Sequence, residues 1–325
     1  MSQTALFSRR LLFVVGKGGV GRTTVALSLA LAAARVGKKV LLIELEGARS
    51  LERAFHALRD APDSPPELER ISLEVVDGQS SLEEYLALVV PVRRLLDTIF
   101  KSAIYQYFVA AAPGLKELMA IGKIWFEAER KERDGSGPDL VIVDAPATGH
   151  GIQYLSMPQA AAETFTVGLV HREAERVAGL LRNGSRTGAV LVTLPEEMPA
   201  NEAVEMAAAL EDIGMSLSLM VVNQYHEPPC EPPELAALEA GLLSGDVDPA
   251  IREDLMQTLD AARAEVEWAA LNEAQVIRLE QQLGARMALL PYLFCEEFSS
   301  EQVGQVADNL TAELAVAPAP SREDS

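Results

Sequence analysis

Short, mostly apolar runs separated by helical patterns are the feature that most constrains the fold of this chain. Runs that are apolar at successive positions are typical of strands buried on both faces. Such strands alternating with helices indicate an α/β fold with an open, doubly wound, mostly parallel sheet, because crossovers between parallel strands are right-handed. The predicted strands are 11–15, 40–45, 71–76, 140–144, 189–194, 217–223 and 286–293.

Two long stretches interrupt this alternation and are predicted to be helical. In the first, about 80–133, apolar residues recur at steps of three and four, which predicts a helical insertion. Pro91 should bend or break that pattern. The second, about 233–284, is rich in Ala, Leu, Glu, Gln and Arg and is expected to form a helical cover packed on the sheet. We expect one domain over 1–315, followed by a disordered tail at 316–325. The periodic residues of the insertion are Tyr85, Val89, Val92, Leu96, Ile99, Ala103 and Tyr107.

Composition excludes several classes of partner. The 325 residues contain 28 Lys and Arg against 48 Asp and Glu, a net charge of −20. This acidity disfavours binding to nucleic acid or to anionic lipid, because both draw on clustered basic residues. Cys230 and Cys295 are too few for a disulfide framework, so a reduced, cytoplasmic setting is expected. The longest stretch without a charged residue, 145–162, contains two prolines and two glycines, so no membrane-spanning segment is expected.

The segment 14–34 predicts a phosphate-binding loop between a buried strand and an Ala/Leu helix. Glycines permit the tight turns of such a loop, and its exposed N–H groups can point at a phosphate. The spacing Gly16-x4-Gly21-Arg22-Thr23 fits the P-loop pattern, with Thr23 placed for magnesium and Arg22 in place of the usual Lys. A glycine-rich turn without a ligand is the alternative. The predicted nucleotide contacts are Gly16, Lys17, Gly18, Gly19, Val20, Gly21, Arg22, Thr23 and Thr24.

A second candidate lies at the end of the strand 140–144, which closes on Asp144. A carboxylate at the end of a buried strand can hold magnesium directly or through water. A helix cap or a surface position is the ordinary alternative for such a residue.

Four segments together resemble one family of P-loop ATPases. The sequence KGGVGRTT, with Lys17 directly after the first glycine, is similar to the deviant P-loop of the MinD/ParA class. The segment DAPATGH (144–150) is similar to the switch loop of the ArsA and tail-anchored-protein-targeting ATPases. The segments VLLIELEGARSLERAF (40–55) and MVVNQYHEPP (220–229) resemble further motifs of that family, so the resemblance extends from about residue 11 to 313.

This resemblance implies ATP and Mg²⁺ as ligands, and a dimer of the chain with itself or with a paralogue. It implies that Lys17 reaches the nucleotide of the partner subunit and that Glu46 positions the attacking water. It also implies that Asn223 reads the adenine, with Pro291 in a second loop beside the base. Gly47 and Arg49 depart from the Pro and His of the family, and a Cys-x-x-Cys zinc clamp is missing.

These observations predict a dimerising, Mg-ATP-dependent ATPase that switches conformation with its nucleotide and acts on an unknown protein client. Its catalytic residues would be Lys17, Arg22, Glu46 and Asp144, with Thr23 and Asp144 as the magnesium ligands. Arg22 and Glu46 also favour an alternative, a nucleotide-binding subunit that hydrolyses weakly and pairs with a paralogous ATPase. A chaperone that binds membrane segments through 80–133 is a third hypothesis. DNA partitioning is disfavoured because the sequence has no basic cluster.

Overall fold

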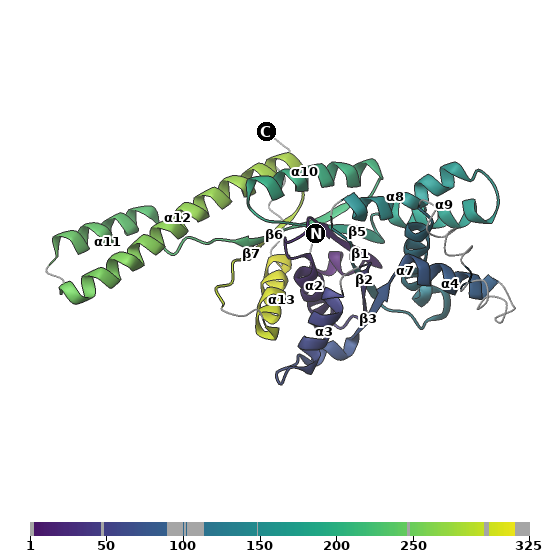
Figure 1. Cartoon of the computed structure of the whole chain (residues 1–325), viewed down its shortest axis with the longest axis horizontal. Helices are drawn as coiled ribbons and strands as arrows, with labels where there is room; N and C mark the ends of the chain where they lie inside the picture. Colours follow the sequence, from purple (N-terminus) through teal and green to yellow (C-terminus); the bar gives the residue numbers. More distant parts are fainter. Residues whose placement is uncertain are drawn as a thin grey trace.

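A seven-stranded parallel sheet forms the centre of the molecule, and this confirms the predicted α/β fold (Figure 1). The computed structural model describes residues 3–46, 49–89, 100, 102, 114–147, 149–245, 248–295 and 299–315. The strand order is β3-β2-β4-β1-β5-β6-β7. The strands are β1 (Leu11–Gly16), β2 (Val40–Leu45), β3 (Ile71–Val76), β4 (Leu140–Asp144), β5 (Thr187–Thr193), β6 (Leu217–Tyr225) and β7 (Met287–Pro291).

Helices cover both faces of the sheet, which explains why the central strands β1 and β4 lack an alternating polar pattern. In β1, Leu12 and Val14 pack in one core layer with α2, α3 and α13. Leu11, Phe13 and Val15 face the opposite layer, which includes α7, α8, α9, α10 and the C-terminal part of α12. The helices are α1 (Gln3–Leu6), α2 (Arg22–Arg35), α3 (Ser50–Asp60), α4 (Gly78–Val89), α7 (Leu115–Asp134), α8 (Gly149–Thr164), α9 (Leu169–Arg182), α10 (Glu197–Asp212), α11 (Pro232–Ser244), α12 (Pro249–Leu283) and α13 (Ser300–Ala315), with a short 3₁₀ turn η1 (Pro66–Arg70).

Helix α2 is buried around its whole circumference, which explains its Ala-rich sequence. All ten residues from Val25 to Ala34 are buried. Small side chains let this helix lie between the sheet and α13, where a helix with a charged face could not fit. Its first turn therefore stays close to the strand ends.

The helices α4 and α7 lie in the predicted insertion and pack against each other. Between them, the predicted break at Pro91 and the apolar positions from Val92 to Ile99 lie outside the described residues. The tail 316–325 also lies outside them, so its predicted disorder stays a prediction.

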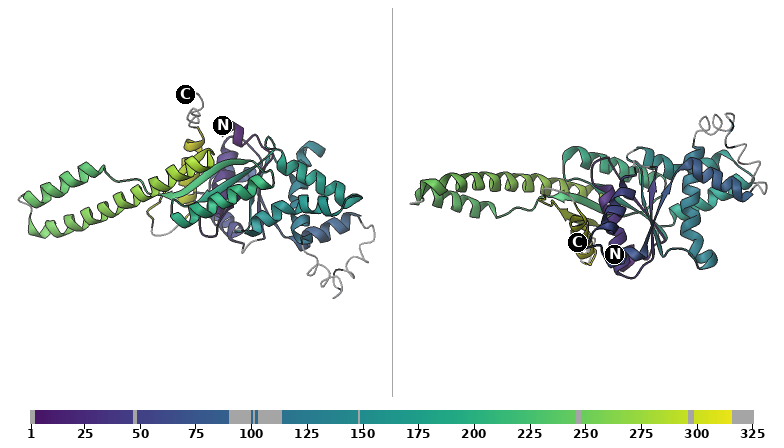
Figure 2. Two further views of the ribbon diagram at one scale, coloured as in Figure 1. Left: turned by 90° about the horizontal axis from the view of Figure 1, so that it is seen from above. Right: turned by 60° about the horizontal axis from the view of Figure 1, so that its bottom comes forward.

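The second helical stretch differs from the expected cover packed on the sheet. Helices α11 and α12 form a hairpin that extends away from the sheet (Figures 1 and 2). The 35 residues of α12 span about 50 Å at 1.5 Å per residue, far longer than the sheet that they would cover. Only its C-terminal part reaches the core, where Leu279 is fully buried. Among the described helices, none is long and apolar enough to cross a membrane.

We predict that Leu279→Ala lowers the free energy of unfolding by about 2–4 kcal/mol, because it leaves a cavity in the core. Leu271→Ala, in the same helix at 60% exposure, should change it by less than about 0.5 kcal/mol. Chemical denaturation measures both values. Equal losses for the two variants would contradict the assignment of Leu279 to the buried face of α12 and of Leu271 to its exposed face.

Candidate functional site

The loop between β1 and α2 has the geometry of a phosphate cradle. Gly19 and Gly21 have φ angles of 88° and 90°, which glycine adopts without strain. A Cβ on Gly16 would lie 2.4 Å from the carbonyl oxygen of Val192 in β5, so the loop starts where only glycine fits. Gly18 and Gly19 are exposed, whereas Val20 is buried and anchors the loop.

Helix α2 begins at Arg22, directly after this loop. Gly21 is its N-cap, and a glycine has no side chain that could cap the first N–H groups. Such N–H groups, together with the positive end of the helix dipole, favour an anion such as a phosphate. Thr24 lies in this first turn and is partly buried. The predicted contacts from Gly16 to Thr24 therefore form one continuous turn at the carboxyl end of β1, the central strand of the sheet.

Thr23 and Asp144 meet beside this turn. The hydroxyl of Thr23 donates a hydrogen bond of 2.7 Å to Oδ2 of Asp144. The parallel register pairs Val14 of β1 with Asp144 of β4, which brings the carboxylate to the start of the loop. The structure thus joins two residues that lie 121 positions apart in the sequence.

The surroundings of Asp144 fit a magnesium ligand. Asp144 is 6% exposed, and its Oδ1 is buried without a hydrogen-bond partner among the described residues. Burial raises its pKa from 3.8 to about 6, against the opposing effects of the Thr23 hydrogen bond and the Arg22 charge. Mg²⁺ commonly takes one or two protein oxygens and completes its shell with phosphates and water. A hydroxyl next to an unpartnered carboxylate oxygen is a suitable donor set for it.

Arg22 lies in the same site, but its guanidinium contacts backbone carbonyls. Nη1 donates to the carbonyl oxygen of Ala145, and Nε donates to that of Lys17 at 3.2 Å. Burial lowers the pKa of Arg22, an effect that the negative charge of Asp144 opposes. The planar fork of an arginine can hold both carbonyls at once, which a lysine ammonium cannot do with the same geometry. In this structure Arg22 ties the phosphate loop to the segment after β4.

Lys17 lies at the exposed side of the loop and pairs with Glu202 of α10 in the same chain. Sequence analysis did not find Glu202, because it lies 185 residues from Lys17 in a helix with no motif of its own. The pair holds the Lys17 ammonium within its own subunit.

Glu46 lies just after β2, and its contacts in this structure are with Gly78 of α4 and Tyr154 of α8. Its Oε1 accepts a hydrogen bond of 3.4 Å from the backbone N–H of Gly78. Burial, and then the hydrogen bond to Glu46, raise the pKa of Tyr154 in α8. Glu46 has a φ of 40°, in the left-handed region that residues with a side chain seldom adopt. Its role toward water stays a prediction.

Sequence analysis also missed Glu44, which is 2% exposed at the end of β2. Its two carboxylate oxygens accept hydrogen bonds from the backbone N–H groups of Ser50 at 2.9 Å and Glu52 at 3.0 Å. A carboxylate at these N–H groups stabilises the start of α3 and so connects the end of β2 with the first turn of α3. An acidic residue in an otherwise apolar strand was the signal that could have revealed it.

Asn223 and Pro291 lie at the ends of β6 and β7. The amide nitrogen of Asn223 donates a hydrogen bond of 2.9 Å to the carbonyl oxygen of Val20, so this side chain holds the phosphate loop. Pro291 pairs with Tyr225 in the sheet, and Tyr292 N–H donates to the carbonyl of Tyr225 at 2.9 Å. Both residues thus lie near the carboxyl ends of two neighbouring strands, and their contact with adenine stays a prediction. The side chain of His150, from the predicted switch loop, lies outside the described residues.

Metal-ligating side chains do not form a larger cluster in the described part of the chain. It holds no group of three or more His, Cys, Asp or Glu side chains that could bind a metal ion. Cys230 and Cys295 are both free thiols. Magnesium beside Thr23 and Asp144 does not require such a cluster, because phosphates supply other ligands.

The parallel sheet, the glycine loop and the Thr23–Asp144 pair define a P-loop nucleotide-binding protein. Comparison with known proteins narrows this class. The profile of the anion-transporting ATPase family, ArsA_ATPase, matches residues 9–171. The chain belongs to this family of ATP hydrolases.

Three relatives illustrate the range of the family. The chain is 30% identical to the ATPase BagA of Mycobacterium tuberculosis over 247 residues, which cover 73% of this chain and 71% of that protein. It is 28% identical to the ATPase get3 of Schizosaccharomyces japonicus over 230 residues, 70% of this chain and 64% of that protein. It is 27% identical to a putative arsenical pump-driving ATPase of Halobacterium salinarum over 235 residues, 66% of this chain and 35% of that protein.

We predict that Asp144→Asn stabilises the ligand-free protein while it weakens Mg-nucleotide binding. A carboxyl whose pKa is raised on folding stabilises the protein when protonated, and this stability is lost as the pH rises through about 6. A neutral amide avoids that loss, so the free energy of unfolding should rise by about 2 kcal/mol at pH 8.

Thermal unfolding in EDTA at pH 8 and pH 5 measures this effect, and the advantage of Asp144→Asn should shrink at pH 5. Addition of Mg-ATP should raise the melting temperature of the wild type more than that of the variant. A variant less stable than the wild type at pH 8 would contradict the prediction.

Proposed function

We propose that this protein is a dimerising, Mg²⁺-dependent ATPase whose conformation switches with its bound nucleotide. The observation that carries the proposal is the hydrogen bond from Thr23 to Asp144, beside a buried and unpartnered Asp144 oxygen at the first turn of α2. A carboxylate is kept in so costly a position when a cation compensates its burial. Phosphate and magnesium are the ligands that the adjoining N–H groups and oxygens suit.

The residues of the site would have separate roles in nucleotide binding and hydrolysis. The backbone N–H groups from Gly16 to Thr24 would bind the phosphates, and Arg22 would add positive charge beside them. Thr23 and Asp144 would hold Mg²⁺, which neutralises phosphate charge when bound. Glu46 would accept a hydrogen bond from the attacking water and so orient it. Asn223 would hold the adenine from the neighbouring strand end, with Pro291 beside it.

Lys17 supports the proposal of a dimer. Its ammonium pairs with Glu202 in its own chain, and the side chains of Lys17 and Glu202 are 36% and 32% exposed. An exposed cation beside the phosphate loop can leave such a pair at little cost, because surface ion pairs contribute little. Lys17 would then reach the nucleotide of the partner subunit, a second copy or a paralogue. There it would stabilise transition-state charge, and hydrolysis would release it.

We further propose that the protein works in the cytoplasm on a protein client. Two free thiols and the acidic composition support this setting. The same acidity disfavours a nucleic-acid partner.

One observation favours a second function, that of a nucleotide-binding subunit that hydrolyses weakly beside a competent paralogue. The guanidinium of Arg22 is already bound to the carbonyls of Ala145 and Lys17. If these bonds persist with nucleotide present, Arg22 contributes less to the developing phosphate charge than a mobile lysine would.

A single-turnover assay separates the two functions. We predict that the wild type releases phosphate from bound ATP in the presence of Mg²⁺ and that Thr23→Ala reduces the rate by about tenfold or more, through loss of a magnesium ligand. Arg22→Lys serves as the third sample, because it keeps the charge and removes the two carbonyl bonds. No phosphate release from the wild type or from Arg22→Lys would reject the enzyme and leave the nucleotide-binding subunit.

The role of Lys17 has its own test. We predict that Lys17→Ala lowers the hydrolysis rate of the dimer by about a hundredfold or more, as expected for a cation that stabilises transition-state charge. ATP binding to the isolated chain should change by less than about threefold. Lys39→Ala is the matched control. Lys39 is exposed and precedes β2, so it lies at the amino ends of the strands, whereas the phosphate loop lies at their carboxyl ends.

Equilibrium titration and turnover assays measure these two quantities, and native mass spectrometry in ATP shows the subunits of the dimer. Unchanged turnover of Lys17→Ala would reject the contact across the interface. It would not contradict the proposed role of the phosphate loop in nucleotide binding.

A further inference from the structure

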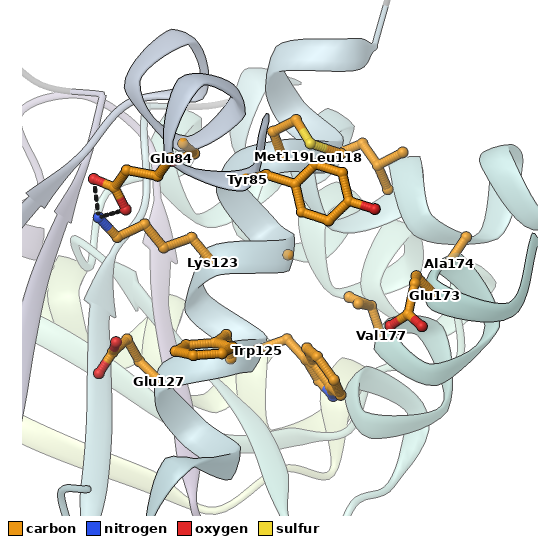
Figure 3. Close-up of a pocket in the computed structure, with 13 residues that line it drawn as sticks. Glu84, Tyr85, Leu118, Met119, Lys123, Trp125, Glu127, Glu173, Ala174 and Val177 are labelled. Carbon is orange, nitrogen blue, oxygen red and sulfur yellow. Dashed lines mark hydrogen bonds and ion pairs between the residues drawn. The ribbon is translucent and has the colours of Figure 1, made fainter. Parts of the chain in front are cut away.

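A cavity of about 360 Å³ lies in the helical region, away from the phosphate loop (Figure 3). It is bounded by α4, α7 and α9, and most of its lining is apolar. This volume lies within the range of small-molecule sites. Gly122 of α7 lines it, and a Cβ built there would meet no atom within 4 Å. A larger side chain at this position would therefore occupy open space, which the present sequence leaves vacant.

Aromatic side chains surround part of this space. Tyr85 of α4 and Trp125 and Phe126 of α7 line the cavity. The ring of Phe126 already faces a cation, because the guanidinium carbon of Arg133 lies 3.8 Å from its centroid. Tyr85 is 37% exposed, so its ring is accessible to a ligand. Aromatic faces of this kind attract cations such as alkylammonium groups.

The charged groups of the lining have a strong bias toward negative charge. Among the lining residues that the structure describes, Glu84, Glu127 and Glu173 are acidic and Lys123 is basic. The Lys123 ammonium lies between Glu74 at 2.7 Å and Glu84 at 2.8 Å. These two carboxylates already compensate the charge of Lys123, so an anionic ligand would gain little from it. Glu127 and Glu173 pair with Arg130 and Arg176, each at 2.9 Å, and neither arginine is among the described lining residues.

Glu173 offers the best position for a cationic head group. Its Oε1 accepts a hydrogen bond of 2.9 Å from Arg176, and its side chain is 35% exposed. Among the described residues Oε2 of Glu173 has no partner, so it can accept a further hydrogen bond or face a cation. Figure 3 shows Glu173 beside Ala174 and Val177, on the side of the cavity opposite Lys123. The apolar side chains of Ala174 and Val177 thus lie beside a carboxylate oxygen that can accept a further hydrogen bond.

We propose that this cavity binds a small organic cation with an apolar body, such as an alkylammonium or arylammonium compound. The body would displace water from the space above Gly122, between α7 and α9, and the cation would lie between Glu173 and the ring of Tyr85. This ligand site does not depend on the proposed ATPase cycle. It is also distinct in kind from a client helix, because the volume suits a compact molecule.

Trp125 makes a direct test possible. The chain has two tryptophans, so Trp268→Phe leaves Trp125 as the only one, inside the cavity lining. In this background we would titrate three probes with the same chain, octyltrimethylammonium, 1-octanol and octanoate, and follow the Trp125 fluorescence. Calorimetry with the unmodified protein would measure the same affinities.

We expect octyltrimethylammonium to bind about tenfold more tightly than octanoate, with 1-octanol between them. Glu173→Gln should reduce ammonium affinity by about threefold to tenfold and leave 1-octanol affinity unchanged. Equal affinities for the ammonium and the carboxylate, or no binding of the ammonium, would overturn the proposal.

Gly122→Leu should fill the cavity and weaken ammonium binding by about tenfold or more. Gly241→Leu is the matched control, because Gly241 lies within α11 and its Cβ would also meet no atom within 4 Å. Both changes replace a helical glycine, so both should fold at least as stably as the wild type. Wild-type affinity in Gly122→Leu would overturn the proposal. So would a hydrophobic peptide helix that binds α7 where none of the three probes does, because it would assign the cavity to a macromolecular partner.

Discussion

The contact between Thr23 and Asp144 depends on the parallel register of two neighbouring strands, and the rest of the site is arranged around it. The pairing of Val14 with Asp144 places the carboxylate beside the start of the glycine loop. The pairing of Gly16 with Val192 on the other side of β1 brings a carbonyl so close that a side chain at position 16 would not fit. The loop therefore begins at this close contact, and its Gly18 and Gly19 are exposed.

Polar contacts from distant parts of the chain keep this loop in place. Asn223 binds the carbonyl of Val20, and Arg22 binds the carbonyls of Ala145 and Lys17. Through these bonds the ends of β4 and β6 are connected to the same turn. A nucleotide that changed the position of the loop would also displace both strand ends. Such a displacement could reach the helices that follow them, α8 after β4 and α11 after β6. The pair of Lys17 with Glu202 extends this connection to α10.

The two helical regions relate to the sheet in different ways. Helices α4 and α7 lie beside it and enclose an apolar cavity with α9. Helices α11 and α12 extend outward, and exposed apolar residues such as Leu243 and Ile251 lie on this hairpin. The difference follows from length, because α7 has 20 residues and α12 has 35. The first is comparable in length to the sheet, while the second exceeds it and must project.

Local patterns in the sequence determined much of this protein. All seven strands were predictable because each is a short apolar run between turns, and the phosphate loop was predictable because its glycines, its helix and Thr23 are contiguous. Asp144 was a candidate because it ends an apolar strand, and the structure places it beside Thr23. Contacts between residues far apart in the chain were not predictable. Glu202 beside Lys17 and the carbonyls bound by Arg22 carry no local signal.

Composition likewise predicted the helices of 232–283 but not their direction, since helical propensity contains no information about what a helix packs against. The sequence by itself determined which segments are strands, helices and phosphate loop, because those depend on neighbouring residues. Only the tertiary structure decided which side chains meet, because strand order and register bring together residues more than a hundred positions apart.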